Sequence, residues 1–119
     1  MKTFLAVYTG NPALRERFER EYSDPAKRKA LEQRGIAAWG AWVQSNQASI
    51  EAMGGPLGKT KRVGPDGISD VRNNLAGYTL VRAESHEAAA ALFRDHPHFS
   101  VFPGEAVEVM EVLPVPGAR

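Results

Sequence analysis

The stretch from Gly77-Tyr-Thr-Leu-Val-Arg to Met110-Glu-Val-Leu-Pro-Val115 decides the fold of this chain. Both of its ends alternate side chains in the way that β-strands do. Between these ends, Ser85 is typical of a helix N-cap, and the alanine-rich segment after it predicts a helix over 86–95. The helix must stop before the turn His96-Pro-His-Phe-Ser100, because a residue that precedes proline avoids helical angles. The stretch therefore predicts strand, helix, turn and strand.

Both predicted strands of this stretch, over 77–83 and 106–112, are apolar on both faces. In the first strand, one face carries Tyr78 and Leu80, and the other carries Thr79, Val81 and Ala83. In the last strand, one face carries Val107 and Val109, and the other carries Met110 and Val112. A sheet with two apolar faces has to be covered on both of them.

The N-terminal third predicts a strand over 3–8 that is also apolar on both faces. Two helices follow it, and each begins with a capping residue and a proline, at Asn11-Pro12 and at Asp24-Pro25. The first is short and charged, and it runs to about Tyr22. The second covers 26–48 as one long helix with an apolar stripe.

The middle of the chain predicts a short strand over 50–53 and then a hairpin. The hairpin has an extended basic arm over 57–63, the turn Gly64-Pro-Asp-Gly67, and a return arm over 68–71. The complete order is β-α-β-(hairpin)-β-α-β. This order is typical of a ferredoxin-like α+β fold, an antiparallel sheet with both helices on one face.

Helices on one face leave the second apolar face of the sheet open. We therefore expect a homodimer in which two sheets pack face to face, a dimeric α+β barrel. One domain accounts for residues 1–119, with residues 113–119 as a flexible tail.

Composition excludes several classes of function. The 119 residues contain no cysteine, which excludes disulfides and thiolate chemistry. The formal net charge of +1 gives no global field for nucleic acid or membrane, so neither is an expected partner. The chain shows no signal peptide and no apolar run that could span a bilayer. We expect a cytoplasmic protein, and since no cofactor motif occurs, we expect no cofactor.

The chain resembles the YCII-related, or DGPF-domain, family of small proteins. The resemblance rests on five pieces in order, which are Met1-Lys-Thr-Phe-Leu5, Gly54-Gly-Pro-Leu57, Gly77-Tyr78, the helix after Ser85, and the ending from Gly104 to Val115. It implies the dimeric ferredoxin-like fold over nearly the whole chain.

The chain departs from this family at its signature residues. Ser69-Asp70 stands where the Asp-Gly-Pro-Phe motif would begin, but Val71-Arg-Asn73 follows. Some relatives carry a histidine in the first long helix, which is proposed to pair with an aspartate near the hairpin. Here that helix holds Trp39 and Trp42 and no histidine, so only the aspartate has an equivalent, Asp70.

The candidate catalytic pair is therefore His96 with Asp70. His96 is the predicted acid or base, and Asp70 is its orienting partner if the hairpin folds back over the sheet. Each also has a structural reading, since a turn histidine favours a helix C-terminus and a turn aspartate bonds to local backbone. His98 has the same two readings, as a ligand-binding residue or a cap.

The candidate ligand-binding residues form two groups. Lys59 and Arg62, beside a glycine-rich segment, are a possible clamp for a phosphate or carboxylate, or a solvated edge hairpin. Trp39, Trp42 and Tyr78 either line an aromatic pocket or belong to the core.

Two carboxylates in the last strand, Glu108 and Glu111, interrupt opposite faces. One of them has to face the partner sheet, where it would pair with Arg82 or Arg72, or act in catalysis.

Two functions remain open from the sequence. The first is a cofactor-independent enzyme that acts on an unknown small molecule by acid/base chemistry. The alternative is a non-catalytic dimer that binds a small ligand or regulates. Replacement of His96 and Asp70 by alanine would separate the two, because only the enzyme would lose turnover.

Overall fold

The computed structural model describes residues 1–117, so the last two residues of the predicted tail lie outside it. In this range the strands are β1 (Lys2–Thr9), β2 (Ile50–Pro56), β3 (Thr60–Gly64), β4 (Gly67–Val71), β5 (Leu75–Ala83) and β6 (Ala106–Glu111). The helices are α1 (Pro12–Glu21), α2 (Pro25–Ser45), a 3₁₀ turn η1 (Gln47–Ser49), α3 (His86–Ala91) and α4 (Pro97–Ser100).

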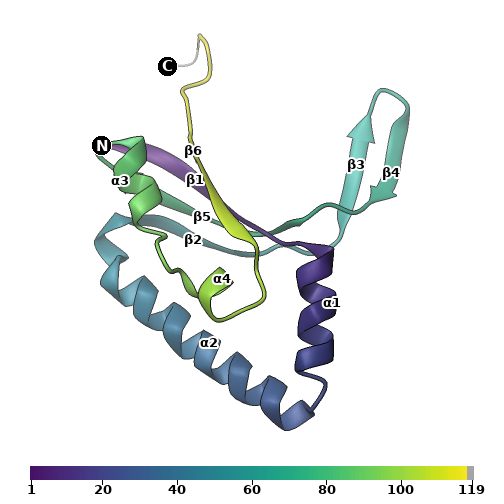
Figure 1. Ribbon diagram of the computed structural model, residues 1–119. Coiled ribbons are helices and arrows are strands. Elements are labelled where there is room, and N and C mark those ends of the chain that lie inside the picture. Colours follow the sequence, from purple (N-terminus) through teal and green to yellow (C-terminus); the bar gives the residue numbers. More distant parts are fainter. Residues whose placement is uncertain (118–119) are drawn as a thin grey trace.

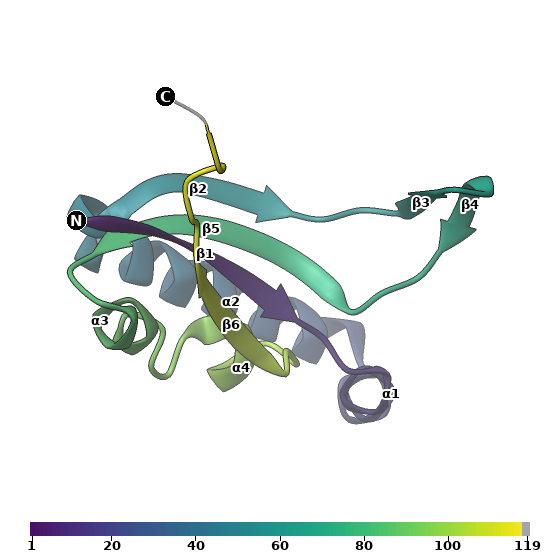
Figure 2. The same cartoon turned by 90° about the horizontal axis from the view of Figure 1, so that it is seen from above.

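Four strands form one sheet in the order β2-β5-β1-β6, and all neighbours are antiparallel. The helices lie on one side of this sheet, and the other side carries none (Figures 1 and 2). Strands β1 and β2 belong to the first β-α-β half, and β5 and β6 belong to the second, so strands of the two halves alternate across the sheet. This arrangement confirms the predicted ferredoxin-like α+β fold. Within residues 1–117 the sheet stays open and does not close into a barrel.

The core lies between the sheet and the helices. Phe4, Ala6 and Tyr8 alternate along β1 and are almost fully buried. They pack with Val81 of the neighbouring β5 and with Phe93, which follows α3. The predicted alternation is confirmed, because these residues all share the helix side of the sheet.

The opposite sheet face is apolar but uncovered. Register places Leu5 beside Leu80 and Met110, and Val7 beside Tyr78, on this face. Leu5 and Leu80 are half-buried, whereas Tyr78 is 36% exposed and Met110 is 42% exposed. A surface of this kind is typical of an interface.

The two predicted helix starts are confirmed. Asn11 and Asp24 each accept a hydrogen bond from the backbone amide two residues later, at 2.9 and 3.0 Å. A proline follows each cap, where its missing N–H costs nothing. Even the longest helix, α2, lacks the run of apolar residues that crossing a bilayer requires, and the same holds for the other helices of residues 1–117.

The segment around the three histidines differs from its prediction in two places. α3 ends at Ala91 rather than near Asp95. The chain there tightens into i→i+3 turns, and Asp95 adopts a left-handed φ of 53°, which ends the helical path. The predicted turn after it is instead one helical turn, α4, with Pro97 at its first position.

The hairpin of β3 and β4 is confirmed as an element, with Val63 opposite Ile68 and Gly64 opposite Gly67. It extends away from the sheet and does not fold back over it (Figures 1 and 2). Gly67, with a φ of 115°, permits the tight turn at its tip.

Candidate functional site

A cavity of about 650 Å³ opens between α2 and the edge of the sheet. Its walls are aromatic and aliphatic side chains together with four glycines, and its polar side chains come from β1, β5 and α4. The lining residues that carry the argument are Tyr8, Trp39, Tyr78, Thr79, His98 and Phe102. A concave, mostly apolar site with few polar groups is the usual form of a small-molecule site.

Two glycines make room at the edge of the sheet. Gly54 has a φ of 65°, and a Cβ there would collide with the carbonyl oxygen of Tyr78. A Cβ at Gly77 would come within 3.0 Å of the Gly55 carbonyl and 3.2 Å of the Tyr8 ring. The register of β2 also shifts between Ala52 and Gly55. The edge strand therefore bends around this end of the sheet only because side chains are absent.

His98 is held in one orientation at the cavity. Its Nε2 lies 2.7 Å from the carbonyl oxygen of Thr9, and since that oxygen can only accept, Nε2 donates. A Cβ at Gly104 would overlap this edge of the ring, so Gly104 allows the close packing. The neutral imidazole consequently keeps its free lone pair on Nδ1.

The Nδ1 atom of His98 remains accessible. In the described part of the chain, Nε2 of His96 is the one fully buried side-chain nitrogen or oxygen that lacks a hydrogen-bond partner. Nδ1 of His98 also makes no hydrogen bond there, so it keeps contact with the cavity or solvent. Burial lowers the pKa of His98, and the bond to Thr9 acts in the opposite direction. The ring is therefore neutral at pH 7, with an open acceptor.

A second fixed acceptor comes from a chain of hydroxyl groups. Thr79 Oγ1 donates to the carbonyl of Met53 at 3.0 Å, which uses its single proton. The phenol of Tyr8, 2.7 Å away, must then donate to Thr79. Burial raises the pKa of Tyr8, so the phenol stays protonated, and its bond to Thr79 leaves a lone pair of its oxygen unused.

His96 lies behind the cavity, with no exposed surface. Its Nδ1 accepts the backbone amide of His98 at 3.0 Å and caps α4. The ring is enclosed by Tyr8, Trp39 and Trp42, with centroids 4.5 to 5.2 Å away. Burial, and then the charge of His98, lower its pKa to about 4. The ring is neutral at pH 7, and its lone pair is occupied.

Asp70 is not brought to His96. It lies on β4 in the projecting hairpin, exposed, and its carboxylate pairs with Lys61 at 2.6 Å. The predicted pairing of these two residues is corrected by this geometry, because it required a hairpin folded over the sheet. Of the predicted basic clamp, Arg62 packs over Gly64 within the hairpin, while Lys59 lines a second cavity at the hairpin root.

The aromatic group divides in the same way. Trp39 lines the cavity together with His98, and Tyr78, whose side chain lies on the open sheet face, borders the cavity at the sheet edge beside Gly54. Trp42 instead donates from Nε1 to the carbonyl of Leu92 at 2.7 Å and packs on Phe93, in the core. Tyr8 and Thr79 were not singled out as site residues, although Thr79 is a polar residue on the otherwise apolar inner face of its strand.

No three histidine, cysteine, aspartate or glutamate side chains gather anywhere in residues 1–117 to hold a metal ion.

Comparison with known proteins adds little to this geometry. No family model matches the chain, so the resemblance to YCII-related proteins stays a prediction. No curated protein matches it either. Among solved structures, it is similar to 5-chloro-2-hydroxyhydroquinone dehydrochlorinase from Burkholderia phenoliruptrix AC1100 in complex with 2,5-dihydroxybenzoquinone. The two are 19% identical with a TM-score of 0.48, over 90% of this chain and 89% of that one. A likeness of this degree carries no functional argument.

Proposed function

We propose that this protein binds a small, flat ligand with a hydroxyl or N–H donor, and that His98 removes a proton from it without a cofactor. One observation carries the proposal. The cavity joins aromatic walls to two polar side chains, Tyr8 and His98, whose hydrogen bonds leave a lone pair unused on Tyr8 Oη and on His98 Nδ1. Aromatic walls select flat, apolar ligands, and unpaired acceptors select donors.

In the proposed step, neutral His98 takes the proton of the ligand hydroxyl at Nδ1. The electron pair of the broken O–H bond stays on the ligand oxygen and delocalises into the ring. The resulting imidazolium keeps its Nε2 bond to the Thr9 carbonyl, which favours the charged ring. The lowered pKa keeps His98 in its basic form at neutral pH.

Resorcinol is a suitable probe, because it is flat, carries two donors and exchanges ring hydrogens after ionisation. We expect saturable quenching of Trp39 fluorescence, recorded in a Trp42→Phe background. We also expect catalysed deuterium uptake at the ring carbons, followed by NMR. A general base contributes about a hundredfold or more, so His98→Gln should lower the exchange rate by that factor. The glutamine amide can still donate to Thr9, which preserves the local fold.

The outcomes separate the two candidate functions. Exchange that falls in His98→Gln at unchanged resorcinol occupancy supports the base. Saturable binding with exchange equal in both proteins would leave the non-catalytic ligand-binding protein. If resorcinol, phenol and 4-hydroxybenzoate all fail to saturate, the cavity proposal itself is overturned.

We propose further that a second copy of this chain covers the open sheet face. The face carries Arg82 at one end, opposite Thr3, and Glu108 at the other, opposite Val7. Both side chains are exposed, and neither is in an ion pair within residues 1–117. A two-fold axis through the apolar centre would bring each arginine to the glutamate of the other copy. This self-complementary charge pattern favours a homodimer over an unrelated partner.

A further inference from the structure

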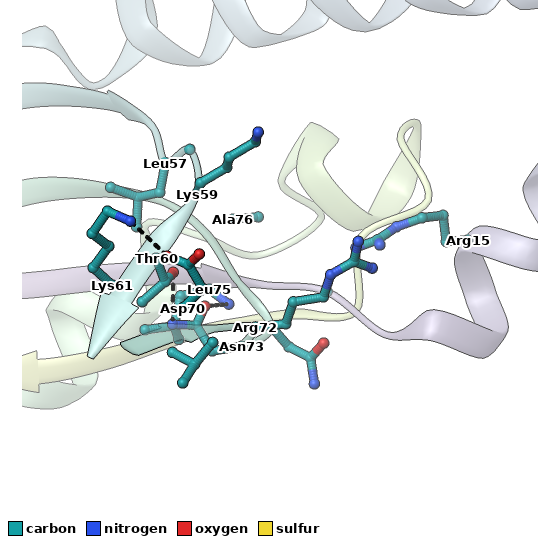
Figure 3. A pocket seen from close by; sticks show the side chains of 14 residues that line it. Arg15, Leu57, Lys59, Thr60, Lys61, Asp70, Arg72, Asn73, Leu75 and Ala76 are labelled. Carbon is teal, nitrogen blue, oxygen red and sulfur yellow. Dashed lines mark hydrogen bonds and ion pairs between the residues drawn. The ribbon is translucent and has the colours of Figure 1, made fainter. Parts of the chain in front are cut away.

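A second cavity, of about 960 Å³, lies at the root of the projecting hairpin. One wall is the segment from Leu57 to Lys61, another is the segment from Asp70 to Ala76, and the third is the corner between β1 and α1, with Gly10 and Arg15. Figure 3 shows the side chains of Arg15 and Arg72 reaching toward one another across this space.

The charges that line this cavity do not balance. Arg15, Lys59, Lys61 and Arg72 face a single carboxylate, Asp70. Lys61 already holds that carboxylate at 2.6 Å. The side chains of Arg15, Lys59 and Arg72 have no ion-pair or hydrogen-bond partner among the described residues. Like charges that share a site repel one another, and an anion between them relieves the repulsion.

Local bonds fix the two backbone segments that carry the arginines. Gly10 N–H donates to the Asn74 carbonyl at 2.8 Å, which ties the start of α1 to the segment before β5. Asn73 accepts from the Leu75 amide at 3.0 Å and donates to Thr60 at 3.2 Å, which ties that segment to β3. The guanidinium groups therefore approach from anchored positions on both sides.

We propose that this cavity is a binding site for an oxyanion group, a phosphate or a carboxylate, held between Arg15 and Arg72 with Lys59 at the rim. Guanidinium groups offer planar pairs of donors that match these oxyanions. The cavity is larger than one ion, so the natural ligand is a small molecule that carries the anionic group. The site does not depend on the proton-transfer proposal. Ala76 borders both cavities, so the two sites are neighbours.

Thermal denaturation with added inorganic phosphate, citrate or chloride at matched ionic strength tests the site. We expect phosphate and citrate to raise the melting temperature in proportion to the logarithm of their concentration, beyond the chloride control. Arg15→Gln and Arg72→Gln should each weaken phosphate binding about tenfold or more, measured by calorimetry. Arg94→Gln removes an exposed arginine outside the cavity and should bind phosphate as the parent does.

A second readout has the opposite sign. Without added anion and at low salt, removal of either arginine relieves the repulsion, so the melting temperature should stay equal or rise. A rise with loss of phosphate binding supports the site. Equal stabilisation by chloride, or unchanged phosphate binding in both variants, overturns it. Resorcinol binding should survive both changes, so failure here is distinguishable from failure of the proposed function. Phosphate esters against free phosphate, and succinate against acetate, then show which source supplies the anion.

Discussion

The two faces of the central sheet are built from the same four strands, yet they differ in what covers them. On the helix side, Phe4, Ala6 and Val81 have no exposed surface. On the other side, their immediate neighbours Leu5 and Leu80 stay half-buried, and Met110 is 42% exposed. The chain thus covers one apolar face with its own helices and leaves the other without cover.

The difference separates folding from assembly. Side chains on the helix side contribute to the stability of the single chain, since their burial needs no partner. Side chains on the open side contribute fully only when a second surface covers them. Substitutions at neighbouring positions of one strand should therefore be detected by different measurements.

The largest effect is expected on the covered face. Phe4→Ala removes a fully buried ring and leaves a cavity, which should lower the free energy of unfolding by about 3–5 kcal/mol. Urea titration at low protein concentration measures this. Leu5→Ala, one residue along the same strand, is the matched control and should cost clearly less in the monomer. Equal losses at both positions would contradict the distinction between the faces.

A substitution on the open face should change the affinity of the proposed dimer. Leu80→Lys places a charge at the centre of the proposed interface, twice per dimer. We expect the dissociation constant to rise at least about a hundredfold, since each ammonium would lose hydration. Sedimentation should change from twice the 13.0 kDa chain mass to that mass, with the circular dichroism spectrum unchanged. Gln33→Lys, on the exposed side of α2, should leave the assembly intact. A parent protein that sediments at 13.0 kDa would end the dimer proposal.

The charges at the two ends of the open face allow a sharper version of this test. Glu108→Arg alone should weaken the dimer, because it would face Arg82 of the other copy. The combined Arg82→Glu and Glu108→Arg protein should recover much of the lost affinity. If the double variant is no better than either single one, the two residues do not meet across the interface.

Acidification should lower the free energy of unfolding, because the buried histidines lie among the side chains of the covered face. Their pKa values are lowered in the folded chain, that of His96 from 6.5 to about 4, so the unfolded chain binds protons first as pH falls. The stabilising contribution is complete above pH 6.5 and is lost progressively toward pH 4. For His96 it amounts to about 3 kcal/mol.

A His96→Asn variant checks the source of this pH dependence. Asparagine can still accept the His98 amide as a helix cap but does not titrate. Its stability at pH 7 should be lower, because the ring leaves a space among the aromatic residues. Its loss of stability between pH 6.5 and 4 should be smaller than in the parent. A parent curve that is flat across this range would show that the buried ring does not titrate there.

Alternation and capping were enough to predict the fold. The inner and outer residues of β1 and β5 follow directly from the period of a strand. Asn11-Pro12 and Asp24-Pro25 identified the starts of α1 and α2 for a local reason. His96-Pro97 is a third start of the same form, since its side chain also accepts the amide two residues later. The sequence predicts a turn over these residues, and histidine is not among the preferred N-cap residues.

The candidate site was less predictable, because its parts meet only in three dimensions. Tyr8 and Thr79 are 71 positions apart and bond at 2.7 Å because β1 and β5 are neighbours. The expected contact of His96 with Asp70 depended on the direction of the hairpin, which the short connections at its root determine. No periodic pattern encodes that direction. The predicted site residues that do share a cavity, Trp39, Tyr78 and His98, come from three separate elements.

The smallest expected effect on stability lies where the covered face opens into the cavity. Gly40 lies well inside α2, away from the helix ends, is exposed and lines the cavity. A Cβ there would meet nothing within 4 Å. Gly40→Leu should therefore raise the free energy of unfolding by roughly 0.5–1 kcal/mol, through helix propensity alone. The new side chain would occupy the mouth of the cavity, so resorcinol binding should weaken although the protein is more stable.

Ala41→Leu, the next residue and outside the cavity, should leave binding unchanged. A loss of binding in a stabilised protein cannot come from unfolding, so it would locate the ligand at this edge of the sheet. Unchanged binding in Gly40→Leu would place the ligand elsewhere.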